Sequence, residues 1–232
     1  MKKKDLVNYV KNKNDSLTNQ KIGYFNIVFK DHFINDINYK YVFNNINNLL
    51  PDHFLNLVEI VYVGQFDFLI QRDVNASYMD GAIYVSNIQD DEADLTDDIV
   101  HEIAHAVEEA HGEEIYSDRY LEQGFVAKRH QLQRVLKYLG IQTSQYDFNN
   151  ISYDEGFDKF LYKEIGYEKL NNLSIGIYLS PYSMTSIREY FARGFEEYFL
   201  GDRSYLRKVC PYIYSKITSL EDDKDLQHET QY

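Results

Sequence analysis

The sequence predicts an α+β protein with two lobes: an N-terminal α/β lobe of residues 1–112 with a mixed sheet, and a mainly helical C-terminal lobe of residues 113–232. Its length of 232 residues is enough for one sizeable domain or for two lobes that share a cleft. Short apolar runs typical of strands lie before Asp90, whereas helical patterns fill most of the chain after Gly112. One long helical pattern, residues 95–107, lies between these regions.

The N-terminal lobe should contain several strands and one helix ahead of that long pattern. The predicted strands are residues 22–29, 57–63, 66–70 and 82–87. The segment from Asn38 to Leu50 has a helical pattern, and Pro51 should end it because proline cannot continue a helix.

The C-terminal lobe should be almost entirely helical. The predicted helices are residues 117–139, 154–164, 185–200 and 202–218. Gly140 should end the first of them, and Pro211 should interrupt the last.

The long pattern of residues 95–107 predicts a helix packed on a core, since its apolar side chains repeat with helical spacing. Asp94 or Thr96 can cap the start of this helix. The acidic cluster of residues 90–98 suits a helix N-terminus, where negative charge is favourable, better than it suits a second metal site.

Within this helix, His101, Glu102 and His105 form the pattern His-Glu-x-x-His. Two histidines four residues apart lie on one helix face, so both imidazoles can reach a single metal ion. A catalytic zinc keeps three protein ligands and a water molecule, and a neighbouring carboxylate can take a proton from that water. The pattern therefore predicts a zinc site with His101 and His105 as ligands and Glu102 as general base.

The third ligand has two candidates in the sequence. His111 stands six residues after His105, but Glu108 occupies the position where a metzincin has the glycine that breaks the helix. We expect the helix to continue to about His111 and to point that side chain away from the zinc. Glu189 is the other candidate, at the margin of the apolar stripe of a helix whose glutamate could complete a His2Glu site.

The chain resembles the anthrax lethal factor catalytic-domain family, a group of gluzincins that also includes the Pro-Pro endopeptidases. The similar parts are residues 101–107, Tyr182 with residues 189–192 seven positions later, and Cys210-Pro211 with Tyr214 and Ile217. The resemblance implies a two-lobed zincin-like metallopeptidase fold. It also implies that Glu189 is the third zinc ligand and that Tyr182 stabilises the oxyanion of the tetrahedral intermediate.

The chain departs from the family pattern in two places. Arg193 stands where the family commonly has a second carboxylate near a zinc histidine, so Glu196, Glu197 or a backbone carbonyl should take that role. The interval from His105 to Glu189 is longer than in short family members, which implies an inserted helical segment.

Composition narrows the functional classes. A net charge of −13 disfavours nucleic-acid binding, and a basic or neutral protein substrate is easier to attract. The single cysteine, Cys210, fits a reducing compartment and is expected to be a small buried residue. The N-terminus lacks a secretory apolar region, and no apolar run is long enough to span a membrane. We expect a cytoplasmic or virus- or phage-associated protein, with secretion by another route left open.

The function that these features predict is zinc-dependent hydrolysis of peptide bonds in a protein substrate bound as an extended strand. The strand Gly81–Ser86 is expected to be the sheet edge that pairs with that substrate. One alternative is an inactive zincin-fold binding or structural module of a virion or toxin, for which Arg193 is the best argument. Another is a metzincin-like hydrolase that uses His111, with Met184 under the site. The oligomeric state stays open.

Overall fold

The computed structural model describes residues 18–222. Within this range the chain forms two compact units, residues 18–110 and residues 111–222. The first unit contains a mixed sheet with helices, and the described part of the second is helical. The protein therefore belongs to the α+β class, as the sequence predicts.

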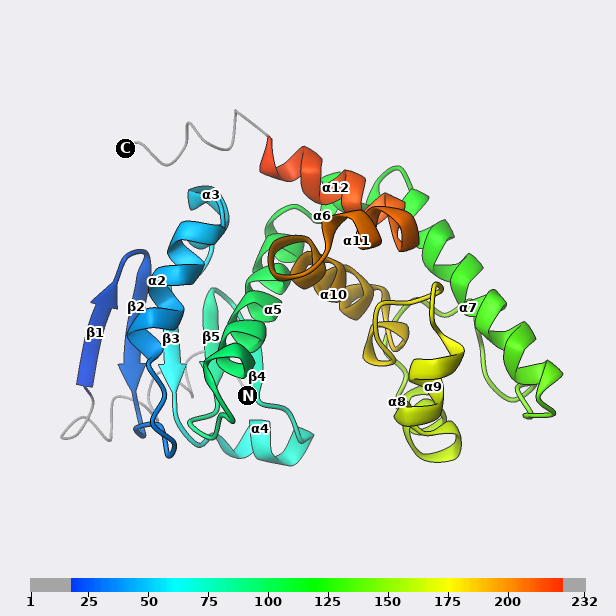
Figure 1. Ribbon diagram of the computed structural model, residues 1–232, viewed down its shortest axis with the longest axis horizontal. Helices are drawn as coiled ribbons and strands as arrows, with labels where there is room; N and C mark the ends of the chain where they lie inside the picture. The colour runs from blue at the N-terminus through cyan, green and yellow to red at the C-terminus, as the bar shows by residue number, and fades with distance from the viewer. Residues whose placement is uncertain (1–17, 223–232) are drawn as a thin grey trace. The chain divides into compact units, whose positions relative to one another are not determined.

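The sheet of the first unit has five strands in the order β1-β2-β3-β5-β4 (Figure 1). The strands are β1 (Thr18–Ile22), β2 (Phe25–Phe29), β3 (Ile60–Val63), β4 (Ala76–Met79) and β5 (Ala82–Val85). The two outer pairs, β1 with β2 and β4 with β5, are antiparallel, whereas β3 pairs in parallel with both β2 and β5. The strands β1 and β4 therefore form the two edges of the sheet.

Helices cover both faces of this sheet. On one side lie α2 (Tyr39–Leu49) and α5 (Glu92–Ala110), which contact each other, while α3 (Asp52–Leu55) contacts α5 (Figure 1). On the other side, α4 (Asp67–Arg72) packs Leu69 against Ala82 and Tyr84 of β5. Ile83 and Val85 alternate with these residues along β5 and are fully buried. Because successive side chains of a strand point to opposite faces, β5 contributes apolar side chains to the core on both faces of the sheet.

Two of the predicted strands differ from the structure. The run 66–70 is not a strand, because Asp67–Arg72 forms α4 and Asp73 ends this helix with a left-handed conformation (φ 54°). The predicted strand 22–29 is divided by a turn at Gly23 (φ 57°), which separates β1 from β2. The predicted helix 38–50 is confirmed as α2, with Asn38 accepting a hydrogen bond from the amide of Tyr41.

The second unit consists of short and long helices. They are α6 (Gly112–Tyr116), α7 (Tyr120–Tyr138), α8 (Glu155–Lys159), the π-helical η1 (Phe160–Ile165), α9 (Tyr167–Leu173), the 3-10 turn η2 (Tyr182–Met184), α10 (Ile187–Leu200), α11 (Arg203–Val209) and α12 (Pro211–Glu221). The four predicted helical regions are all present, and Pro211 interrupts the last one as expected. The sequence did not predict α6 or α9.

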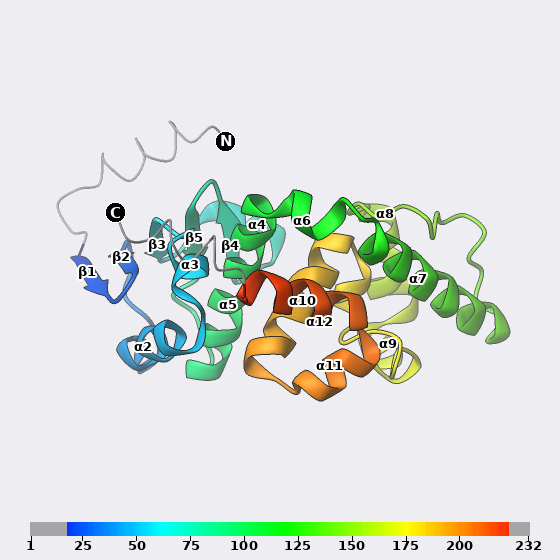
Figure 2. The same cartoon turned by 90° about the horizontal axis from the view of Figure 1, so that it is seen from above.

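The core of the second unit lies where α7, α10 and α12 meet (Figure 2). Phe125, Phe191 and Ile213 are fully buried, one on each of these helices. Gly194 allows α10 and α12 to approach closely, because a Cβ at this position would collide with Ile213. This packing fixes the position of α10 within its unit.

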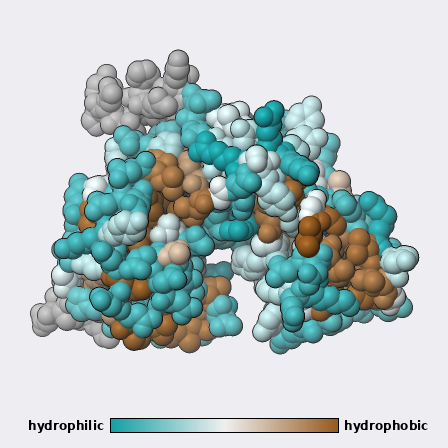
Figure 3. All heavy atoms as spheres, in the orientation of Figure 1, coloured by the Kyte–Doolittle hydropathy of each residue, from teal (hydrophilic) through white to brown (hydrophobic). Residues whose placement is uncertain are grey.

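On the face shown in Figure 3, hydrophilic side chains cover most of the surface and hydrophobic side chains gather in patches among them. Among the helices of residues 18–222, none combines the length and apolar character that a membrane span requires.

Candidate metal centre

The helix α5 carries the two histidines and the glutamate of the His-Glu-x-x-His pattern. Its predicted core side is confirmed, because Leu95, Ile99, Ile103 and Val107 are all fully buried. The helix is thus held against its own unit by its apolar side chains, and this contact fixes the direction in which its polar residues project.

The start of α5 differs from the prediction. The Asp91 carboxylate accepts hydrogen bonds from the amides of Ala93 and Asp94, both at 2.9 Å. Asp91 therefore caps the helix, whereas Asp94 and Thr96 lie inside it and the prediction of a cap at either is wrong.

Three side chains are close enough to share a metal ion. A ring nitrogen of His101, a ring nitrogen of His105 and a carboxylate oxygen of Glu189 all lie within 4.8 Å of one another. His105 is buried, and His101 and Glu189 are half-buried. The two imidazole rings are 4.9 Å apart between centroids and nearly perpendicular, at 81°. Two nitrogen donors and one oxygen donor form a set that suits zinc.

Local structure explains the position of Glu189. Ser186 precedes α10 in an extended conformation, and its hydroxyl accepts a hydrogen bond from the amide of Glu189 at 3.2 Å. Glu189 consequently lies in the first turn of α10, where the helix dipole favours a negative charge.

His111 is not part of this group among the described residues. The helix α5 ends at Ala110, slightly before the predicted end, and His111 precedes α6 as a buried residue. Its carbonyl accepts a hydrogen bond from the amide of Ile115. The position of His111 near the helix end agrees with the expectation.

A carboxylate that the sequence reading missed lies beside the second histidine. Glu108, one turn after His105 on α5, places Oε2 at 3.4 Å from His105 Nδ1, and both side chains are buried. A carboxylate at Nδ1 fixes the ring tautomer and orientation and leaves Nε2 as the ligand atom. The spacing of three residues between His105 and Glu108 places both side chains on one helix face, and this spacing could have indicated their contact.

Arg193 interacts with Glu196 and Glu197, the two carboxylates that the sequence offered for this role. Its guanidinium pairs with the Glu196 carboxylate and lies 3.6 Å from that of Glu197, all on α10. Glu108, which contacts His105 directly and belongs to the same helix as the histidines, is a further candidate for the second carboxylate.

Glu102 lies at the free edge of the sheet. It is 6% exposed, and its Oε2 accepts a hydrogen bond of 2.5 Å from the Tyr78 amide of β4. Met79 and Ala82 flank the two-residue turn Asp80-Gly81, so the next pair, Tyr78 with Ile83, is a non-hydrogen-bonded pair. The amide and carbonyl of Tyr78 therefore point away from β5.

The prediction that the strand Gly81–Ser86 forms the edge of the sheet is wrong. The strand Ala82–Val85 is β5, which pairs with β3 on one side and β4 on the other. Among the described residues, the edge strand beside β5 is β4, which the sequence did not predict because Ala76–Met79 is short and lacks a regular apolar alternation.

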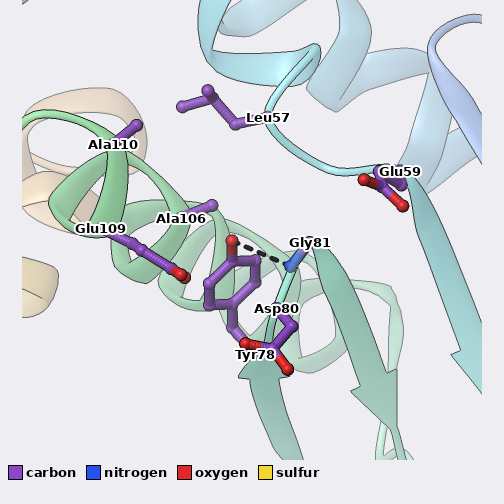
Figure 4. A pocket seen from close by; sticks show the side chains of 8 residues that line it. All are labelled: Leu57, Glu59, Tyr78, Asp80, Gly81, Ala106, Glu109 and Ala110. Atoms are coloured by element: carbon purple, nitrogen blue, oxygen red, sulfur yellow. Dashed lines mark hydrogen bonds between the residues drawn. The ribbon is translucent and has the colours of Figure 1, made fainter. Parts of the chain in front are cut away.

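A cavity of about 530 Å³ lies beside the β4–β5 turn (Figure 4). It is lined by Leu57, Glu59, Tyr78, Asp80, Gly81, Ala106, Glu109 and Ala110. The Tyr78 hydroxyl accepts a hydrogen bond from the Gly81 amide at 3.0 Å, and burial raises the pKa of this phenol to about 12, with Glu109 adding to the rise. The carboxylates of Glu59, Asp80 and Glu109 line the cavity, so the electrostatic potential inside it is negative.

Asp98 lies one turn before His101 on α5. Burial raises the pKa of this carboxyl to about 7, although the Gln89 amide donates a hydrogen bond to it at 3.0 Å. The sequence predicts that Asp98 belongs to a solvated acidic cluster, whereas in the structure this side chain is half-buried.

The tyrosines around Glu189 differ in exposure. Tyr182 belongs to η2 and is 39% exposed, whereas Tyr178 and Tyr190 are buried. The Tyr178 hydroxyl donates a hydrogen bond to the Phe125 carbonyl at 3.3 Å. Among these three, Tyr182 is the phenol that solvent and a ligand can reach.

Cys210 is a buried free thiol, and burial raises its pKa. This agrees with the expectation of a small buried residue.

No protein-family model matches the chain, and neither a curated protein nor a solved structure matches it.

Proposed function

We propose that the protein is a zinc-dependent endopeptidase with a zincin-like fold, similar to the lethal factor catalytic domains. The observation that carries this proposal is the group of His101, His105 and Glu189, whose ligand atoms lie within 4.8 Å of one another. Glu102 follows the first histidine and is buried at an open strand edge, where an extended peptide can pair.

The three ligands would hold zinc, which supplies a Lewis acid that polarises the scissile carbonyl and activates water. Glu102 takes a proton from the attacking water and gives it to the nitrogen of the leaving amine. The Tyr78 amide holds one of its carboxylate oxygens and so fixes its orientation. The Tyr182 phenol donates a hydrogen bond to the carbonyl oxygen as negative charge develops there.

The substrate would add to β4 as a further strand. Because the Tyr78 amide is bonded to Glu102, the outward Tyr78 carbonyl and the outward amide and carbonyl of Ala76 would supply the main-chain hydrogen bonds, and the side chains of β4 would supply the specificity. The net charge of −13 and the carboxylates of Glu59, Asp80 and Glu109 favour a segment with basic or neutral residues. A peptide-library cleavage profile of the zinc-loaded protein measures this preference.

Metal content tests the proposal. The purified protein should bind about one zinc ion, and His101→Ala, His105→Ala or Glu189→Ala should weaken binding strongly. The control is His111→Ala, which should retain the metal. Loss of zinc in His111→Ala together with retention in Glu189→Ala would contradict the gluzincin assignment and favour a metzincin-like site.

The inactive-module alternative depended on Arg193, and this residue pairs with Glu196 and Glu197 on its own helix. Failure of the zinc-loaded protein to cleave any library peptide would favour that alternative.

A further inference from the structure

Arg129 is a charged side chain inside the second unit. It lies on α7 and is 1% exposed. Its guanidinium stacks between two aromatic rings, 4.7 Å from the Phe125 centroid and 4.3 Å from that of Phe157. Burial lowers the pKa of Arg129 to about 10, so the group is still a cation at neutral pH. A buried cation is unfavourable unless its partners compensate for the lost water.

The partners of Arg129 are main-chain carbonyl oxygens. Nε and Nη2 donate to the Met184 carbonyl at 3.1 and 2.7 Å, and Nη2 also donates to the Thr185 carbonyl at 2.8 Å. Nη1 donates to the Asn150 carbonyl. Two of these three acceptors lie in the short stretch of chain between Tyr182 and Glu189.

Two separate sets of local hydrogen bonds stabilise this stretch of chain. In the first, the Thr185 amide and hydroxyl donate to the Tyr182 carbonyl at 3.0 and 2.8 Å and close the turn η2. In the second, the Ser186 hydroxyl caps α10 by accepting from the Glu189 amide. Arg129 binds the chain at the junction of these two parts, so its loss would free the turn to move relative to the helix.

We propose that Arg129 is the positioning residue that fixes the segment from Tyr182 to Glu189, and so sets the placement of the oxyanion donor and the third metal ligand. The importance of these two placements rests on the function proposed above. Arginine suits this role because its planar fork carries five donors in fixed directions. A lysine ammonium at this position could not serve three carbonyls with the same directional control.

Lys128 offers a matched control on the same helix. Its ammonium is also partly buried and also donates to main-chain carbonyls, at Val209 (2.7 Å) and at Ile177. Burial lowers its pKa, as it lowers that of Arg129. Lys128→Met therefore removes a comparable cation and comparable hydrogen bonds, but outside the Tyr182–Glu189 segment.

Hydrogen exchange of the metal-free protein tests whether Arg129 fixes the segment. Amides of residues 183–189 should exchange at least about tenfold faster in Arg129→Met than in the wild type, since a hydrogen bond to a charged group is lost. In Lys128→Met these amides should exchange at the wild-type rate. Equal acceleration in both variants would overturn the proposal, because it would indicate general loosening of the core.

Metal affinity and kinetics test the consequence for the site. At a temperature where both variants are folded, Arg129→Met should weaken zinc binding about tenfold and lower kcat by about 10²-fold. Lys128→Met should keep both values within about twofold of wild type. Wild-type zinc affinity and kcat in Arg129→Met would overturn the positioning role.

A third variant keeps the test open if Arg129→Met does not fold. Arg129→Lys retains the charge, and we expect it to show the same faster exchange and lower kcat to a smaller degree. Wild-type behaviour of Arg129→Lys would show that charge alone suffices and would overturn the role of the fork. A wild-type protein that binds no zinc and cleaves nothing would refute the proposed function, while the exchange comparison would still decide whether Arg129 fixes the segment.

Discussion

Replacing Glu108 with alanine should weaken zinc binding without unfolding the protein. Removal of a carboxylate that orients a metal-binding histidine typically lowers metal affinity about 10- to 100-fold. The separation of 3.4 Å between Glu108 Oε2 and His105 Nδ1 exceeds the roughly 2.7–2.9 Å of a strong charge-assisted hydrogen bond. We therefore expect the lower end of the range, a loss of about tenfold, or about 1.4 kcal/mol.

The assay is competition for zinc against a chromogenic chelator, together with thermal unfolding of the metal-free forms. The control is Glu109→Ala, which removes the same charge from the next position of α5, where the side chain is exposed and lines the cavity. Glu108→Gln should lose less affinity than Glu108→Ala, because it keeps an acceptor oxygen. Equal zinc affinities for Glu108→Ala and Glu109→Ala would refute the role assigned to this carboxylate.

Two further predictions concern turnover. Glu102→Gln should keep its zinc but lower the rate by at least about 10²- to 10⁴-fold, because the base is lost; single-turnover kinetics and metal analysis check this, and near-normal turnover would remove Glu102 from the mechanism. Tyr182→Phe should lower kcat by about 10- to 10³-fold with little change in KM or zinc content. Tyr178→Phe, which loses a buried hydrogen bond to Phe125, should lower stability and leave kcat unchanged; the reverse pattern would show that the resemblance assigns the oxyanion donor to the wrong tyrosine.

The sequence predicted the features that depend on helical spacing. The buried side of α5 and the closeness of His101 and His105 follow from intervals of four residues, and both are present in the structure. The sequence offers Glu189 as a candidate ligand, but its selection over His111 rests on the family resemblance, because an acidic residue on an amphipathic helix is usually solvated.

Features that depend on tertiary contacts were not predictable in this way. The edge strand β4 is four residues long and is defined by pairing with β5, so the sequence reading assigned the edge to the wrong strand. Similarly, the three carbonyl acceptors of Arg129 lie 21, 55 and 56 residues away from it, and no local pattern connects them. The segment 66–70 was predicted as a strand and is largely helical, because a short apolar run suits either a strand or a short helix.

The hydrogen bond between the Tyr78 amide and Glu102 also concerns self-association. An open sheet edge presents unpaired amides and carbonyls to which a second chain can add, and proteins commonly block such edges with charge. Here the blocking group is the carboxylate proposed as the general base, which occupies the outward amide of Tyr78. Substitutions at position 102 that abolish this acceptor would uncover the Tyr78 amide, so in the proposed enzyme one side chain would affect both self-association and turnover.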